Sequence, residues 1–116
     1  MMAEYLLMFR GGDEKRKKLS PNEIQEHMQK WFDWVDSMRD RKIYQGGDPL
    51  EGGGKTVKPD MTVTDGPFTE SKELIGGYIV IEVGSEEEAV GEAKNCPVLS
   101  IDGTVEVRTI ADIDRH

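Results

Sequence analysis

Three short stretches of the chain have the hydrophobic pattern of β-strands. Residues 77–83 alternate strictly, so one face of the predicted strand carries only branched apolar side chains: Ile79, Ile81 and Val83. Residues 104–110 alternate in the same way and place two valines on one face. Residues 4–10 contain a run of large apolar side chains and are followed by two glycines, which is typical of a strand buried on both faces.

Two helices are predicted between these strands. Residues 20–23 read Ser-Pro-Asn-Glu, which places serine at the N-cap, proline at the first helical position and glutamate where it closes a capping box. This helix should end near Arg41, and its core-facing stripe follows the helical period: Ile24, Met28, Trp31, Phe32, Trp34, Val35 and Met38. A second helix begins after Ser85, where consecutive glutamates complement the helix dipole, and ends at 95–97.

The segment between the first helix and the 77–83 strand differs in composition from the rest. Residues 46–67 are rich in glycine, proline and threonine and predict a turn-rich excursion. Within it, residues 55–58 and 61–64 have the β-branched content of two short strands, which indicates a hairpin arm. Residues 13–18 end in four consecutive basic side chains, and this charge run predicts a solvated, flexible loop.

The predicted order is strand, helix, hairpin excursion, strand, helix, strand. This order indicates an α+β fold of the ferredoxin-like type, a split βαβ arrangement with an antiparallel sheet and two helices on one face. The length of 116 residues fits a single domain over residues 1–116.

Charge and cysteine content narrow the classes of partner. Lysine and arginine number 15 against 23 aspartates and glutamates, and the net charge of −8 opposes nucleic-acid binding by charge neutralisation. The single cysteine, Cys96, cannot form an internal disulfide and suits a reducing compartment. The apolar run at residues 5–9 is too short for a signal peptide or a membrane span. We therefore expect a cytoplasmic protein that binds neither nucleic acid nor membrane.

Metal and cofactor signatures are weak in this sequence. Two histidines and one cysteine do not make a convergent metal site. Residues 52–56 read Gly-Gly-Gly-Lys-Thr, but they lack the glycine spacing and the following helix of a phosphate-binding loop. The expectation is that the protein uses no metal and no cofactor.

Residues 64–78 carry the most specific motif in the chain. They read TDGPFTESKELIGGY, and this run resembles the signature of the DGPF subfamily in the YCII-related domain family. The tryptophan-bearing helix, the glycine pair at 46–47 and the Val-Glu-Val-Arg run at 105–108 agree with it, so the resemblance covers essentially the whole chain. It implies a ferredoxin-like subunit that dimerises into an α/β barrel with a ligand cleft. Some family members are fused to, or occur near, extracytoplasmic-function sigma factors, which makes a sigma factor one expected partner.

Two groups of residues are candidates for ligand binding. In the motif, Asp65 can accept backbone N–H bonds, Gly66 can adopt positive φ before Pro67, and Phe68 supplies a rigid apolar wall. The second group lies on the sheet face opposite the predicted helices: Tyr78, Glu82, Glu106 and Arg108. A buried arginine there would have to be paired, and would hold a carboxylate of the protein or of a ligand. A two-fold dimer that stacks this face would bury its apolar part and line a cleft with its charges.

An acid/base enzyme is the alternative interpretation. Some YCII-related proteins resemble acid/base enzymes with a histidine on the first helix and an aspartate beyond it, but the position of that histidine falls near Lys30 here. His27 lies one turn earlier, on the face of the two tryptophans, where a histidine at the edge of an aromatic core is the structural interpretation. The candidate proton carriers are His27, Asp48, Asp65 and Glu82.

Three hypotheses therefore remain open. The first is a dimeric module that binds a small molecule or a regulatory partner in a cleft near the motif. The second is a small cofactor-free enzyme of isomerase or lyase type. The third is an oligomerising structural domain without a ligand.

Overall fold

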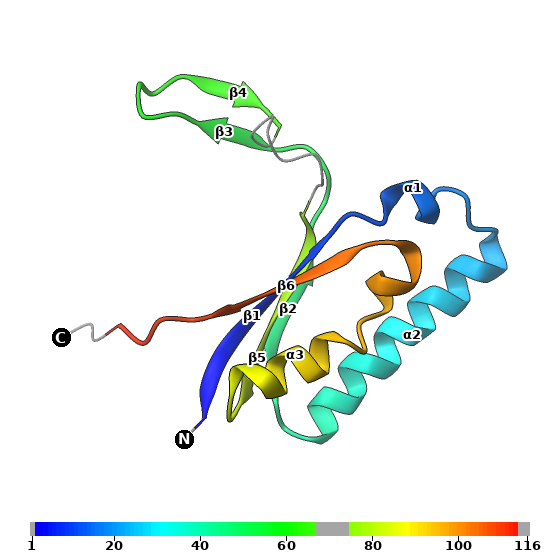
Figure 1. The fold of residues 1–116 in the computed structure, drawn as a ribbon. Helices are drawn as coiled ribbons and strands as arrows, with labels where there is room; N and C mark the ends of the chain where they lie inside the picture. The colour runs from blue at the N-terminus through cyan, green and yellow to red at the C-terminus, as the bar shows by residue number, and fades with distance from the viewer. Residues whose placement is uncertain (1, 67–74, 114–116) are drawn as a thin grey trace.

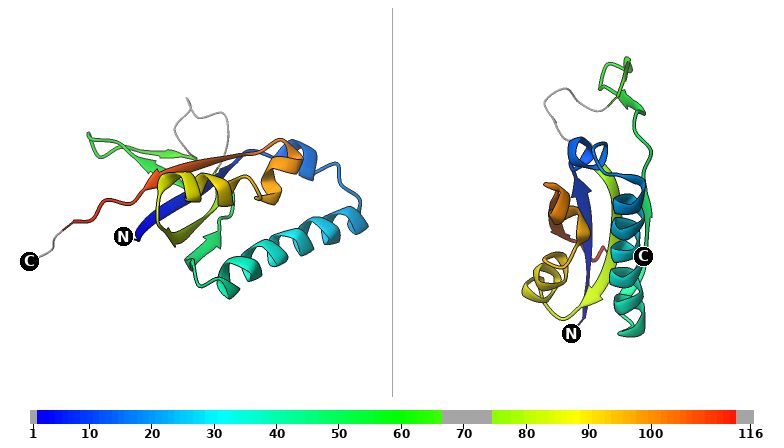
Figure 2. Two further views of the ribbon diagram at one scale, coloured as in Figure 1. Left: turned by 60° about the horizontal axis from the view of Figure 1, so that its bottom comes forward. Right: turned by 90° about the vertical axis from the view of Figure 1, so that its right-hand side faces the viewer.

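A computed structural model describes residues 2–66 and 75–113 (Figure 1). In chain order the elements are β1 (Ala3–Arg10), α1 (Asp13–Arg16), α2 (Pro21–Asp40), β2 (Tyr44–Pro49), β3 (Lys55–Val57), β4 (Val63–Asp65), β5 (Ile75–Val83), α3 (Glu86–Ala93), a 3₁₀ helix η1 (Pro97–Ile101) and β6 (Thr104–Thr109). Four strands form an antiparallel sheet in the order β2-β5-β1-β6, and β3 pairs with β4 in a separate hairpin. With α2 and α3 side by side on one face of the sheet (Figure 2), this is the predicted ferredoxin-like α+β arrangement.

The hydrophobic core lies between the sheet and the two packed helices. Its fully buried side chains come from the centre of the fold and include Leu7 on β1, Met38 on α2 and Ile81 on β5. The buried hydrophobic residues together are Tyr5, Leu7, Phe9, Trp34, Met38, Ile79, Ile81, Val83, Ala89, Ala93, Cys96, Val98 and Ile101. Burying each large aliphatic or aromatic side chain contributes about 1.5 to 3 kcal/mol, so this cluster is the main source of stability.

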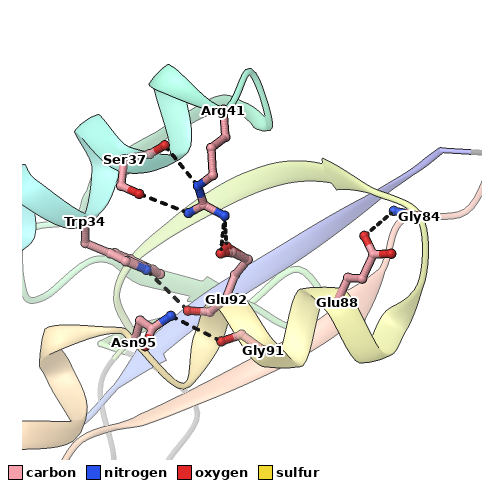
Figure 3. Close-up of polar contacts among 8 residues, drawn as sticks. All are labelled: Trp34, Ser37, Arg41, Gly84, Glu88, Gly91, Glu92 and Asn95. Carbon is pink, nitrogen blue, oxygen red and sulfur yellow. Dashed lines mark hydrogen bonds and ion pairs between the residues drawn. The ribbon is translucent and has the colours of Figure 1, made fainter.

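A polar joint fixes the end of α2 to α3 (Figure 3). Arg41, the C-cap of α2, donates from Nη1 to both carboxylate oxygens of Glu92, at 2.7 and 2.8 Å. The same guanidinium donates to the backbone oxygen and the hydroxyl of Ser37, each at 3.2 Å. The indole of Trp34 donates to the carbonyl of Glu92 at 3.2 Å. The hydrogen bond with Glu92 raises the pKa of Arg41, because it favours the charged guanidinium.

The predicted helix starts and the hairpin are confirmed. Ser20 accepts a hydrogen bond from the Glu23 backbone, and the Glu23 carboxylate accepts one from the Ser20 backbone, so the capping box forms as expected. Ser85 caps α3 through the backbone of Glu88.

No helix of residues 2–66 and 75–113 is long and apolar enough to cross a membrane.

The sequence prediction was wrong about β2, which it placed within the turn-rich excursion. Gly46 and Gly47 lie inside this strand, and the backbone of β5 explains why residue 47 is a glycine. A Cβ on Gly47 would lie 2.3 Å from the carbonyl oxygen of Tyr78 and 2.7 Å from the Cα of Ile79. Gly47 therefore permits close approach of two strands, a use of glycine that looks like a turn in sequence.

The packing of β1 and α2 also differs from the prediction. β1 is buried on one face only, because Leu6 and Met8 are half-buried on the face without helices. On α2 the apolar stripe is buried only in its C-terminal half, and Ile24, Met28 and Phe32 are 39, 50 and 55% exposed. At 20 residues the helix is about 30 Å long, and the direction of Phe32 differs from that of the buried Trp34 by about 200°.

Residues 13–18 were expected to form a flexible loop, and part of this segment is helical. Asp13–Arg16 form the single turn of α1, with Arg16 Nη2 3.1 Å from Asp13 Oδ1. The Arg16 side chain is 63% exposed and that of Asp13 is 38% exposed, so this ion pair is expected to contribute little to stability.

Candidate functional site

The face of the four-stranded sheet that α2 and α3 leave uncovered, called the open face below, is the candidate site. Its side chains come from alternate positions of all four strands. Those from β2, β5 and β6 were candidates from sequence alone, whereas those from β1 were not. The open face consists of Glu4, Leu6, Met8, Arg10, Asp48, Tyr78, Val80, Glu82, Glu106 and Arg108.

One row of cross-strand neighbours runs from edge to edge of the open face. Asp48 pairs with Tyr78, Tyr78 with Met8, and Met8 with Glu106. The Tyr78 hydroxyl donates to Asp48 Oδ2 at 3.3 Å. The structure thus brings together Asp48 and Tyr78, two residues proposed from sequence in different roles.

A cluster of two arginines and one glutamate lies at the β6 edge. Glu106 contacts Arg10 Nε at 3.4 Å through one carboxylate oxygen and Arg108 Nη1 at 3.2 Å through the other. The Arg108 side chain is 68% exposed and that of Arg10 is 25% exposed. Arg108 lies on an edge strand and is exposed in the single chain, and it pairs with the carboxylate of its neighbour Glu106, one of the two partners that the sequence left open for it.

The end of the open face beyond Arg108 is acidic. Glu82 lies directly opposite Glu4 in the β1–β5 pairing. Like charges that face each other across two strands destabilise the pair. Leu6 and Val80 lie between this acidic end and the Tyr78 row, and both are half-buried.

Asp65 and Gly66 lie on the hairpin and not on the open face. Gly66 has a φ of +80°, as predicted for the residue before Pro67, and its backbone N–H donates to the carbonyl of Gly54 at 2.8 Å. The Asp65 carboxylate forms an ion pair with the ammonium group of Lys55. Pro67 and Phe68 lie outside the described residues.

His27 lies on the helix side of the sheet, within an aromatic cluster. The indole N–H of Trp31 donates to Nε2 of His27 at 3.0 Å, and the Trp31 ring packs edge-on against Phe9. Burial lowers the pKa of His27, and the positive charges of Lys30 and Arg16 lower it further. The sheet separates this imidazole from Asp48, so the structure does not bring the two together. This arrangement agrees with the structural interpretation of His27.

Sequence reasoning missed Met8 and Arg10 as members of the site. Met8 and Arg10 lie two and four residues after Leu6, and therefore on the same face of the first strand. In the sequence, the run of large apolar residues around them obscures this alternation. Among the described residues no three histidine, cysteine or acidic side chains are grouped so as to hold a metal ion.

The family relationship follows from the sequence together with this fold. Comparison with curated proteins gives no match. The profile of the YCII-related domain matches residues 5–114, which include nearly all of β1, both packed helices and β6. A match over almost the entire length, joined to the expected α+β sheet order, shows that the chain belongs to the YCII-related domain family.

Proposed function

We propose that this protein is a dimeric binding module that holds a small polar molecule between the open faces of two copies. The observation that supports the proposal is the row across the open face, which combines a carboxylate–phenol pair with an apolar centre and a guanidinium cluster. Such a mixture suits a polar ligand in a partly apolar cleft.

The charges of the open face are arranged so that the face can complement itself. Asp48 lies on the β2 edge, and Arg108 lies on the opposite β6 edge. A two-fold axis parallel to the strands would lay the β2 edge of one copy over the β6 edge of the other. Asp48 shares a row with Glu106, so it would then face the ion pair of Glu106 and Arg108 in the second copy, twice, on either side of the apolar centre made by Leu6, Met8 and Val80.

The same residues define the kind of ligand. Asp48 can accept hydrogen bonds from a cation or an amide, while Arg108 carries donors that fit a carboxylate. A ligand with both kinds of group would reach the two edges once the copies are stacked. A small zwitterion therefore fits the open face better than an apolar molecule does.

The experiment records amide NMR spectra of the isotopically labelled protein during titration with three probes. The probes are glycine as a zwitterion, pyruvate as an anion and 1,4-diaminobutane as a cation. We expect glycine to bind with a millimolar dissociation constant and to shift the amide signals of β5 and β6. In Asp48→Asn we expect its affinity to be at least five-fold weaker. Shifts confined to the helix side of the sheet, or an affinity unchanged in Asp48→Asn, would contradict the proposal.

An acid/base enzyme is the second candidate, and one contact favours it. The Tyr78 hydroxyl and the Asp48 carboxylate are close enough to relay a proton. In D₂O such an enzyme would exchange the methyl protons of pyruvate, and Tyr78→Phe would abolish the exchange without unfolding the protein. The absence of enzyme-dependent exchange with pyruvate would favour a binding module over an enzyme for this probe.

A further inference from the structure

The hairpin arm, residues 51–66, has no hydrophobic core of its own. Every one of these residues is exposed except Thr56 and Gly66, which are half-buried. Val57, Val63 and Met61 are 64, 57 and 79% exposed. An isolated two-stranded hairpin is at best marginally stable in water, so a surface that covers these side chains would stabilise the arm.

The register of the arm gathers its apolar residues on one side. Val57 pairs with Val63, and next to them Lys55 pairs with Asp65. Thr56 pairs with Thr64 on the opposite side. The arm therefore presents one apolar surface, the Val57–Val63 surface, flanked by an ion pair, and a polar surface behind it.

The arm extends to the side of the sheet away from α2 (Figure 1). It leaves the end of β2, and it projects on the same side as the segment that follows β6. The open face is also on the side away from the helices. A second copy placed on the open face would thus lie on the side toward which the arm projects.

The size of the open face indicates that a stable dimer needs more contact than this face alone provides. It presents ten side chains from the four strands. A stable protein interface engages about 20 to 30 residues on each partner. The arm offers additional apolar surface on the appropriate side.

We propose that the arm reaches over a second copy of this chain and packs its Val57–Val63 surface against it. This inference rests on the proposed function, because it assumes that the two copies meet through their open faces. The two-fold symmetry would place the arm of each copy against the other copy, so both arms would gain a hydrophobic contact that neither has alone.

The first test measures the dimer dissociation constant by sedimentation over a dilution series. Val57→Thr/Val63→Thr keeps the β-branched shape of both side chains and makes the surface polar. We expect a dimer at least ten-fold weaker in this variant, and a change below two-fold in the control Thr64→Ser on the other side of the hairpin. An unchanged constant in the double variant overturns the proposal.

A variant of the open face separates this inference from the proposed function. Val80→Glu places a charge at the centre of that face and should abolish the dimer. If Val80→Glu weakens the dimer and the arm variant does not, the open-face dimer stands and the arm contact is wrong. A protein that is monomeric at every concentration overturns both.

A second measurement does not depend on how the arm variant folds. Met61→Cys carries a nitroxide label at the end of the arm, and the buried Cys96 should remain unlabelled. Mixed dimers then combine this copy with an isotopically labelled copy that has no nitroxide. We expect broadened amide signals in the second copy, and their absence in a mixture shown to contain dimers overturns the proposal.

Discussion

The indole N–H of Trp31 donates a hydrogen bond to Nε2 of His27 across one turn of α2, at 3.0 Å. This bond requires a neutral imidazole that carries its proton on Nδ1. Protonation of Nε2 would set two donors against each other, and burial already disfavours the charged form. The Trp31 ring also packs against Phe9 of the sheet, so the ionisation of His27 is coupled to the aromatic cluster.

This contact predicts how stability depends on pH. Because the pKa of His27 is lowered in the folded protein, the unfolded chain binds the proton first as the pH falls below about 6.5. The contribution of this group to the free energy of unfolding is therefore greatest above the unfolded pKa and decreases as the pH falls through the folded pKa. The free energy of unfolding, measured with urea between pH 8 and pH 5, should show this decrease. Its slope against pH should be shallower in His27→Gln. An NMR titration that places the pKa of His27 above 6.5 would contradict this prediction.

The joint between α2 and α3 predicts a coupled loss of stability. Arg41→Ala removes the hydrogen bonds to Glu92 and Ser37, and we expect a loss of about 1 kcal/mol, since the arginine is half exposed. Glu92→Gln should have a similar effect. In a double-mutant cycle the two losses should not add, because both variants break the same contact. Fully additive losses would show that the ion pair contributes nothing.

The close approach of β2 to β5 predicts opposite effects for the same chemical change at two glycines. Gly47→Ala would force a Cβ against the backbone of Tyr78, and we expect a loss of about 3 kcal/mol or failure to fold. Gly91 on α3 has open space around it, so Gly91→Ala should stabilise the protein by up to about 1 kcal/mol. Thermal unfolding of the two variants measures both effects. A folded Gly47→Ala protein with unchanged stability would show that β2 does not pair in this register.

The burial of the Cys96 thiol predicts that it reacts slowly with thiol reagents in the folded protein. Burial raises the pKa of Cys96 to about 12, so almost no thiolate is present at pH 8. Ellman's reagent should react with Cys96 only after addition of denaturant. Rapid reaction of the native protein would show that η1 opens frequently, since Pro97 and Val98 begin that helix beside the thiol.

Local signals in the sequence were sufficient for the helices and insufficient for the site. The Ser20–Glu23 capping box is complete within four residues, so the start of α2 could be read directly. β2 was missed because the role of Gly47 depends on the distance to Tyr78, 31 residues away in sequence. Met8 was missed as a site residue for a related reason. Its neighbours on the open face are set by pairing with β5 and β6, which lie far along the chain.

The candidate site was predicted in part because its residues belong to two separate structures. The alternation of apolar and polar residues correctly assigned Tyr78 and Arg108 to the face without helices, because successive side chains of a strand point to opposite faces of the sheet. The motif resemblance emphasised Asp65, whose carboxylate pairs with Lys55 on the hairpin and has no described contact with the open face. Contacts between these two regions depend on tertiary or quaternary geometry, which no local pattern encodes.

The position of β1 in the sheet has a consequence for how the protein is made. Leu7 of β1 pairs with Ile79 of β5 on one side and with Val107 of β6 on the other. During synthesis β1 therefore emerges about 70 residues ahead of its first partner, a delay of several seconds at about 5 to 20 residues per second. The helix α2 can form locally in that interval, whereas the sheet closes only once β5 and β6 have left the ribosome. Until then the apolar strand is the segment most in need of protection from aggregation.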